Sequence, residues 1–142
     1  MPADCATPVL EGRLLLDEGK FIELPVRFLY LPEAPYSVVM EFPGFDAAVG
    51  AWEFSRDLLW EGLHTAAGVG DVRIWPPCPT HGLRRLRIML QGEDGTAMVE
   101  VPAKPVRSWL RGRSFALVPR GRESERAAVD WDAELTRLVR GR

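Results

Sequence analysis

Residues 52–76 read WEFSRDLLWEGLHTAAGVGDVRIWP: a strand-like end, a short helix, a glycine-rich turn and a second strand in direct succession. Ser55 is a favoured N-cap residue and Gly62 a favoured helix stop, so we expect about two helical turns between them. A helix this short is marginal in water, and its leucines therefore predict packing against a sheet. The stretch predicts a fold that combines strands with short helices.

Alternating apolar residues predict strands on both sides of this stretch. Segments bounded by Gly, Pro and Asp carry apolar residues at every second position, which is typical of half-buried antiparallel strands. We expect about seven strands. Their shared apolar faces are Leu10, Leu14 and Leu16; Ile22, Leu24, Val26, Phe28 and Tyr30; Val38, Met40 and Phe42; Trp52 and Phe54; Val72 and Ile74; Leu86, Ile88 and Leu90; Ala97, Val99 and Val101. Residues 92–95 predict a hairpin between the last two strands.

Further helices are expected after the last strand. One begins near Pro105, has Val106, Trp109 and Leu110 on one face, and ends at Gly112. Residues 113–128 are rich in Arg, Gly, Ser and Glu and predict a partly mobile connection, in which residues 115–119 pack as an extended segment.

A C-terminal helix is expected to follow, capped by Asp130. Its apolar residues recur at helical spacing, as Trp131, Leu135, Leu138 and Val139. This apolar stripe needs a partner, which is either the sheet of the same domain or another subunit.

The length and composition indicate one domain. A chain of 142 residues can bury about two-thirds of the surface that its unfolded form exposes, so we expect a single domain over residues 1–142 with residues 1–8 frayed. Cys5 and Cys78 are far apart and indicate neither a disulfide framework nor a zinc cluster, which fits a reducing cytoplasm. The first residues lack the features of a signal peptide, and no apolar run approaches about 18 residues, so we expect neither export nor an integral membrane segment.

Residues 52–76 resemble the signature of the SsgA-like proteins, a family of sporulating and other morphologically complex actinomycetes. Other segments follow the family pattern in the same order, so the resemblance covers roughly residues 9–139. These segments are Pro35-Tyr36, Glu93-Asp94-Gly95, Val101-Pro102-Ala103 and Val129-Asp130-Trp131-Asp132-Ala133-Glu134-Leu135.

The resemblance implies both a fold and a function. The fold is α+β, similar to the Whirly single-stranded DNA-binding proteins, with antiparallel sheets packed against two or three helices in a homotrimer. The function is that of a non-enzymatic cytoplasmic protein that positions or promotes septa during sporulation. Its expected partner is the tubulin-like division protein FtsZ or another SsgA-like protein, and it is expected at division septa.

The sequence contains no familiar constellation of catalytic residues. His64 and His81 lack the spacing of a metalloprotease, and neither a nucleophile elbow nor a phosphate-binding loop is present. Gly68 and Gly70 begin like a dinucleotide fingerprint, but Arg73 stands at the third glycine position and the segment leads into a strand. We therefore expect no catalytic site, no cofactor and no metal.

Function is then expected on a surface rich in arginine and tryptophan. Arg73 and Trp75 alternate outward on one strand, and Arg85 and Arg87 do so on the next. If these strands pair, the residues form a candidate partner or subunit interface, because both residue types are enriched in binding hot spots. The other interpretation is an ordinary charged sheet face. Trp60, at a position where the family often has a small residue, is a further candidate or a core residue.

Two alternatives concern the charges. The same arginines and Trp75 suit a single-stranded nucleic-acid-binding protein, although a net charge of −2 argues against the broad positive field of such proteins. Arg107, Arg111 and Arg113 either stabilise the C-terminal end of a helix through its dipole or contact an acidic partner.

Overall fold

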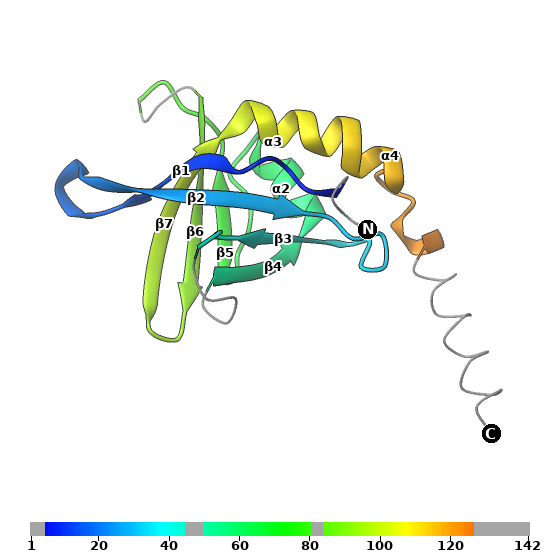
Figure 1. Ribbon diagram of the computed structural model, residues 1–142, viewed down its shortest axis with the longest axis horizontal. Helices are drawn as coiled ribbons and strands as arrows, with labels where there is room; N and C mark the ends of the chain where they lie inside the picture. The colour runs from blue at the N-terminus through cyan, green and yellow to red at the C-terminus, as the bar shows by residue number, and fades with distance from the viewer. Residues whose placement is uncertain (1–4, 45–49, 81–83, 127–142) are drawn as a thin grey trace.

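The computed structural model describes residues 5–44, 50–80 and 84–126, which form one antiparallel sheet with helical segments packed on it (Figure 1). Within these ranges the strands are β1 (Leu10–Leu15), β2 (Phe21–Leu29), β3 (Ser37–Glu41), β4 (Ala51–Ser55), β5 (Val72–Trp75), β6 (Arg85–Gly92) and β7 (Gly95–Pro102). They hydrogen-bond in the order β4-β3-β2-β1-β7-β6-β5. The predicted α+β fold and its seven antiparallel strands are confirmed, and the arrangement is compatible with a Whirly-like fold.

The two long hairpins follow the sequence pattern closely. Gly92 pairs with Gly95 across the β6–β7 turn, as predicted. The β1–β2 hairpin turns through a short 3-10 segment, η2 (Asp17–Gly19), and extends beyond the rest of the sheet (Figure 1). The tip of this hairpin has no strand beside it, because β1 pairs with β7 only at Arg13 and Leu14. Leu16 and Ile22, which the sequence placed on the apolar faces of these strands, are therefore exposed.

The sheet curls so that its inner face encloses the core. A Cβ atom placed on Gly92 of β6 would lie 3.8 Å from the Trp52 ring of β4, although the two strands are far apart in the hydrogen-bonding order. The curled sheet is thus nearly barrel-like. The largest fully buried apolar side chains are Tyr30, Phe28, Met40, Leu59, Ile74, Leu86, Ile88, Leu110, Val26, Val38 and Val99.

Residues 5–7 run beside the end of β2. The amide of Thr7 donates to the Phe28 carbonyl at 2.9 Å, and the amide of Tyr30 donates to the Cys5 carbonyl at 2.8 Å. Cys5 and Thr7 are buried. The fraying expected for residues 1–8 therefore does not extend to residues 5–7, which the sheet holds through these bonds.

Helix α2 (Arg56–Gly62) matches the prediction from the sequence except in the role of Gly62. Ser55 caps it by accepting a hydrogen bond from the Leu58 amide at 3.1 Å. The helix ends at Gly62 as expected, but Gly62 is its last helical residue rather than a left-handed stop, and Leu63 after it also has αR geometry. The small size of Gly62 is instead a packing requirement: a Cβ there would lie 2.3 Å from Cγ2 of Ile74 on β5. This contact seats α2 on the sheet.

The second predicted helix begins earlier and ends later than expected. Helix α3 (Ala103–Trp109) starts directly after β7 and buries Val106 and Trp109, with the Trp109 ring 6.3 Å from Phe28. Gly112 does not end it, because a π-helical segment η3 (Leu110–Ser114) and α4 (Phe115–Leu117) continue the same rod (Figure 1). Residues 115–117 are thus helical, not extended. The predicted C-terminal helix from Asp130 lies outside the described residues.

Arg56 fastens the end of this rod to the core. Its side chain is fully buried and donates to the Ser114 carbonyl at 3.3 Å, to Ser114 Oγ at 3.1 Å and to the Val118 carbonyl at 2.8 Å. It also pairs with the buried Glu123 carboxylate at 2.9 Å. Burial would raise the pKa of Glu123, but the hydrogen bond and charge of Arg56 outweigh it and hold that pKa below its usual value. Arg56 is therefore part of the framework.

Candidate interaction surface on the outer face of the sheet

The predicted arginine and tryptophan patch forms where β5 and β6 pair. Trp75 lies opposite Arg87, and Arg73 lies opposite Met89. Because Ile74 and Leu86 fill the inner face, their neighbours in the strands point to the outer face. The strands β5 and β6 therefore pair as the prediction required, and the four residues share one face of the sheet. Their role as an interface stays a prediction.

A pocket occupies this part of the outer face. Its volume is about 430 Å³, and it is lined by Trp75, Pro76, Cys78, Arg85, Arg87, Met98 and Glu100. Three of the predicted site residues therefore meet around one hollow. Arg73 is exposed on the same face, two residues from Trp75, but does not line the pocket.

A row of charged residues continues from the pocket across the sheet. Arg87 lies opposite Glu100 of β7, Glu100 opposite Arg13 of β1, and Arg13 opposite Glu23 of β2. Arg87 donates to the Glu100 carboxylate at 2.9 Å, and the Glu100 side chain is only 7% exposed. Opposite charges on facing strands stabilise the sheet modestly and hold these side chains in place. The row makes the outer face an ordered surface of alternating charge rather than a uniformly basic one.

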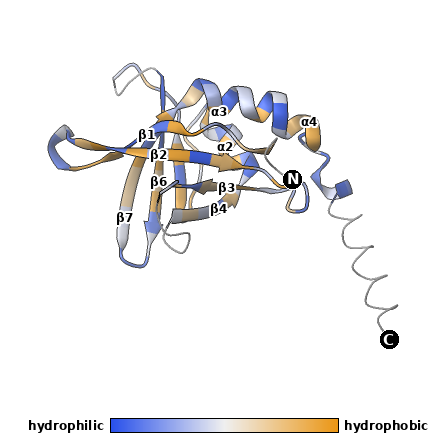
Figure 2. Ribbon diagram, viewed as in Figure 1, coloured by the Kyte–Doolittle hydropathy of each residue, from blue (hydrophilic) through white to orange (hydrophobic). Residues whose placement is uncertain are grey.

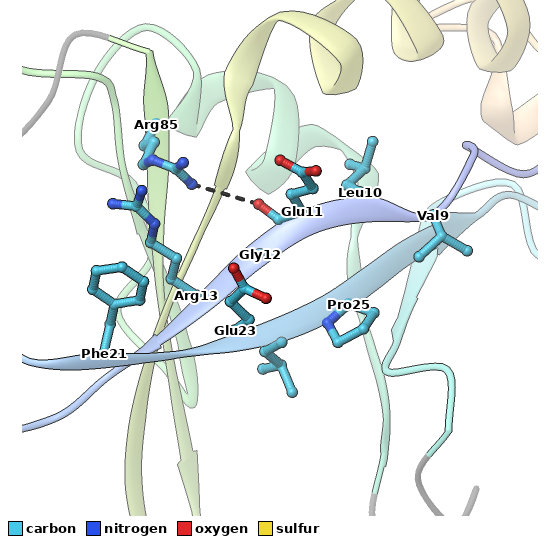
Figure 3. Close-up of a pocket in the computed structure, with 10 residues that line it drawn as sticks. Val9, Leu10, Glu11, Gly12, Arg13, Phe21, Glu23, Pro25 and Arg85 are labelled. Atoms are coloured by element: carbon cyan, nitrogen blue, oxygen red, sulfur yellow. Dashed lines mark hydrogen bonds between the residues drawn. The ribbon is translucent and has the colours of Figure 1, made fainter.

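A second pocket lies beside the first, over β1 and β2 (Figure 3). Its volume is about 240 Å³, and it is lined by Val9, Leu10, Glu11, Gly12, Arg13, Phe21, Glu23, Leu24, Pro25 and Arg85. Arg85 lines both pockets and donates to the Glu11 carbonyl at 3.5 Å. The Arg13 guanidinium lies 4.1 Å from the centre of the Phe21 ring. The two pockets therefore present cationic, anionic and aromatic groups on one continuous face.

Trp60 belongs to a different surface. It lies on α2, which packs on the inner face of β5 through Gly62 and Ile74, so it is separated from Trp75 by that strand. Its ring is half-buried and tilted steeply against Phe115 at 5.3 Å and His64 at 4.8 Å. One side of the Trp60 ring therefore packs against the protein, as expected for a core residue, and the rest of the ring is exposed, as expected for a surface candidate. Trp60 and the four candidate residues of β5 and β6 thus lie on different surfaces, and the role of each as an interface stays a prediction.

Sequence reasoning missed several residues of the outer face. Arg13, Glu23, Met98 and Glu100 were not singled out, yet the inward alternation of Val99 and Val101 already places Met98 and Glu100 outward. The pairing of β1 with β7, which connects Arg13 to Glu100, joins residues distant in sequence. No local pattern could have indicated it.

The described residues offer charged, aromatic and apolar side chains on the outer face. Within residues 5–44, 50–80 and 84–126, no group of three or more His, Cys, Asp or Glu side chains is placed to hold a metal ion. The His64 ring is exposed and its Nδ1 lies 2.9 Å from the Trp60 carbonyl. No helix in this part of the chain has the length and apolar character needed to cross a membrane. The outer face offers ion pairing and apolar contact to a macromolecular partner.

Comparison with known proteins agrees with the resemblance drawn from the sequence. The family model described as "Streptomyces sporulation and cell division protein, SsgA" matches residues 24–123. The sporulation-specific cell division protein SsgB of Streptomyces coelicolor is 36% identical over 130 residues, covering 92% of each chain. SsgB of Salinispora tropica is 41% identical over 140 residues, covering 96% of this chain and 95% of that protein.

Solved structures extend the similarity to the fold. An SsgA-like sporulation-specific cell division protein from Thermobifida fusca superposes with a TM-score of 0.76 at 29% identity, covering 97% of this chain and 99% of the other. A structure described by the words "Mutations in SsgB correlate to longitudinal cell division during sporulation of Streptomyces coelicolor" gives a TM-score of 0.76 at 35% identity, over 86% of this chain and 94% of that one. The sequence match and the shared fold both span most of the chain. The protein therefore belongs to the SsgA family of sporulation and cell division proteins.

Proposed function

We propose that this protein is a non-enzymatic adaptor in sporulation-specific cell division, which positions or promotes the septum by binding FtsZ or another SsgA-like protein. Its relatives are named as sporulation-specific cell division proteins, and in Streptomyces coelicolor mutations in SsgB correlate with longitudinal division. The observation that carries the proposal is the outer-face pocket around Trp75, Arg85 and Arg87. A half-exposed indole beside arginines is the side-chain combination enriched in binding hot spots.

The nucleic-acid alternative is less well supported by the same surface. Arg87 is paired with Glu100, and Arg13 faces both Glu100 and Glu23 across the strands. Carboxylates at these positions repel phosphates, whereas single-stranded nucleic-acid binders use a positive groove with stacking aromatic rings. The outer face therefore fits a polypeptide better than a polyanion.

A direct test uses a double variant, Trp75→Ala with Arg85→Ala. Arg85 makes a single long bond to a carbonyl, so its loss removes no strong contact, whereas Arg87 is unsuitable because its loss would leave the buried Glu100 unpaired. Light scattering of the mixture with unpolymerised FtsZ or a second SsgA-like protein should show a complex that the variant weakens by about 2 kcal/mol, roughly 30-fold. Val69→Ala, at a residue 94% exposed in a turn, is the control and should bind normally. Wild-type protein that binds neither partner contradicts the proposal.

The proposed assembly is a homotrimer. A closed ring of three chains presents the same surface three times and strengthens weak contacts through effective concentration. Light scattering of the isolated protein should give three times the 15.9 kDa chain mass. A monomer at micromolar concentrations argues against this part of the proposal without affecting the partner binding.

The proposed location is the cytoplasm at division septa. A fluorescent fusion in a sporulating host should form ladders that coincide with septa. The Trp75→Ala/Arg85→Ala fusion should be expressed at the same level but be diffuse, because it lacks the partner contact. Ladders formed by the variant would place the recruiting surface elsewhere.

A further inference from the structure

The rod formed by α3, η3 and α4 carries an unusual concentration of positive charge. Residues 101–122 contain six basic residues, Lys104, Arg107, Arg111, Arg113, Arg120 and Arg122, and no Asp or Glu, in a chain whose net charge is −2. Hydrophilic and hydrophobic positions alternate along the rod in Figure 2. Four of the six, Lys104, Arg107, Arg111 and Arg113, lie within the rod itself.

Three of these cations share the outward side of the rod. Val106, Trp109 and Leu110 are buried against the sheet, which leaves Lys104, Arg107 and Arg111 on the opposite side at positions i, i+3 and i+7. Lys104 and Arg111 are exposed and Arg107 is half-exposed. We call these three residues the basic stripe.

The basic stripe lacks the counter-charges that exposed cations usually have. Among the described residues, Lys104 and Arg107 make no ion pair, and the contact that Arg111 makes is with the Trp60 ring, 5.6 Å from its centre. Like charges at i,i+3 and i,i+4 spacing destabilise a helix. The arrangement therefore disfavours the isolated helix and favours a bound anion.

The helix dipole does not account for these positions. Dipole stabilisation acts on cations in the last turn of a helix. Because the rod runs from Ala103 to Leu117, Lys104 lies in its first turn and Arg107 in its second. A positive charge at the start of a helix opposes the dipole. Of the two explanations that the sequence left open for Arg107, contact with an acidic partner is the one that fits its place within the rod, and the same contact suits Lys104.

The surroundings of the stripe favour an acidic polypeptide over other anions. Trp60 is already contacted by Arg111, Arg120, Phe115 and His64, so its ring is poorly placed to stack on a nucleic-acid base. The apolar side of the rod is buried in the core, which excludes the in-plane insertion by which amphipathic helices bind membranes.

We propose that the outward side of α3 and η3 around Lys104, Arg107 and Arg111 is a docking surface for a short acidic segment of a partner protein, whose carboxylates pair with these three residues. This surface is distinct from the outer-face pockets, and it does not depend on the adaptor function proposed for them. From Lys104 to Arg111 the rod rises about 10 Å, which an extended acidic segment of about four residues spans.

The test measures fluorescence anisotropy of a labelled peptide of about ten residues, rich in Glu and Asp, at low and moderate salt. Lys104→Gln/Arg107→Gln removes two unpaired cations, and two lost exposed ion pairs should weaken binding roughly 2- to 30-fold. The matched control is Lys20→Gln/Arg27→Gln, which removes the same charge from positions that belong neither to the basic stripe nor to the outer-face pockets. It should change binding less than about two-fold.

A local readout separates docking from general charge attraction. The indole N–H resonance of Trp60, assigned with Trp60→Phe, should shift on titration with the acidic peptide because Arg111 contacts that ring. A peptide with Gln and Asn in place of the acids should cause no shift. The proposal is overturned if both double variants weaken peptide binding equally, or if the acidic peptide does not bind at low salt. It is also overturned if the protein binds oligothymidine or anionic vesicles more tightly than the acidic peptide.

Discussion

Replacing Glu123 by Gln tests how the rod after β7 is fastened to the core. The change keeps the shape of the side chain but removes the negative charge beside Arg56, whose side chain is 0% exposed. The guanidinium would then have only neutral acceptors at Ser114 and Val118. Removing one partner of a buried ion pair lowers the free energy of unfolding by about 3–5 kcal/mol, a large share of the roughly 5–15 kcal/mol of a typical domain.

Urea unfolding followed by far-ultraviolet circular dichroism measures this loss as a shift of the midpoint at constant slope. Glu125→Gln is the control: its ion pair with Arg122 is exposed at both ends, so the loss should stay below about 1 kcal/mol. The double variant Arg56→Met/Glu123→Leu removes both charges and should be less destabilised than the sum of the single changes. A loss below about 1 kcal/mol in Glu123→Gln, or additive losses, would refute the reasoning.

The same pair predicts a pH dependence with a definite sign. The pKa of Glu123 is lowered in the folded protein, so the pair stabilises the fold above the ordinary glutamate pKa of about 4.3 and its contribution disappears as the pH falls through the lower folded value. The difference in unfolding free energy between wild type and Glu123→Gln should therefore shrink below about pH 4. A difference that stays constant down to about pH 2 would show that the charge is not responsible.

Two further predictions concern packing and titration. Gly62→Ala should lower the free energy of unfolding by about 1–3 kcal/mol, because its methyl group would lie 2.3 Å from Ile74. Gly112→Ala, in open space within the rod, should raise the free energy of unfolding by up to about 1 kcal/mol. Equal effects of the two substitutions in thermal unfolding would contradict this contrast. Burial raises the pKa of Tyr30 to about 12. In Tyr36→Phe, where Tyr30 is the remaining tyrosine, phenolate absorbance should therefore appear near pH 12, and the free energy of unfolding should fall between about pH 10 and pH 12. Ionisation of Tyr30 at a lower pH in the folded protein would contradict this prediction.

The sequence predicted those parts of the fold that local periodicity controls. Alternation located every strand, and Ser55 located the start of α2, because both signals lie within a few neighbouring residues. Gly62 marked the end of α2 correctly, but the reason a glycine is needed there, contact with Ile74 on another element, could not be inferred from its neighbours. Gly112 failed as a stop, since the rod continues where Ser114 and Phe115 contact α2.

The candidate site, like the fold, was predicted from the sequence only where local alternation determines it. Alternation identified the outward residues of β5 and β6, and pairing of these strands brought Trp75, Arg85 and Arg87 together. Alternation could not show that Glu100 neutralises Arg87 or that Trp60 lies on the other side of β5. Both depend on contacts between residues far apart in the sequence. Arg56, in the first turn of a helix, gave no sign of being a core residue.

The two proposed binding surfaces rest on different elements of the fold. The outer-face pockets rest on hydrogen-bonded strands, with Arg87 held by Glu100. The basic stripe rests on a rod fastened to α2 by Arg56 and its partners. Because β5 lies between Trp75 and α2, the pocket around Trp75 and the ring of Trp60 lie on opposite sides of that strand. No residue of the basic stripe lines either outer-face pocket, so the two proposals together predict that the protein can bind two partners at once.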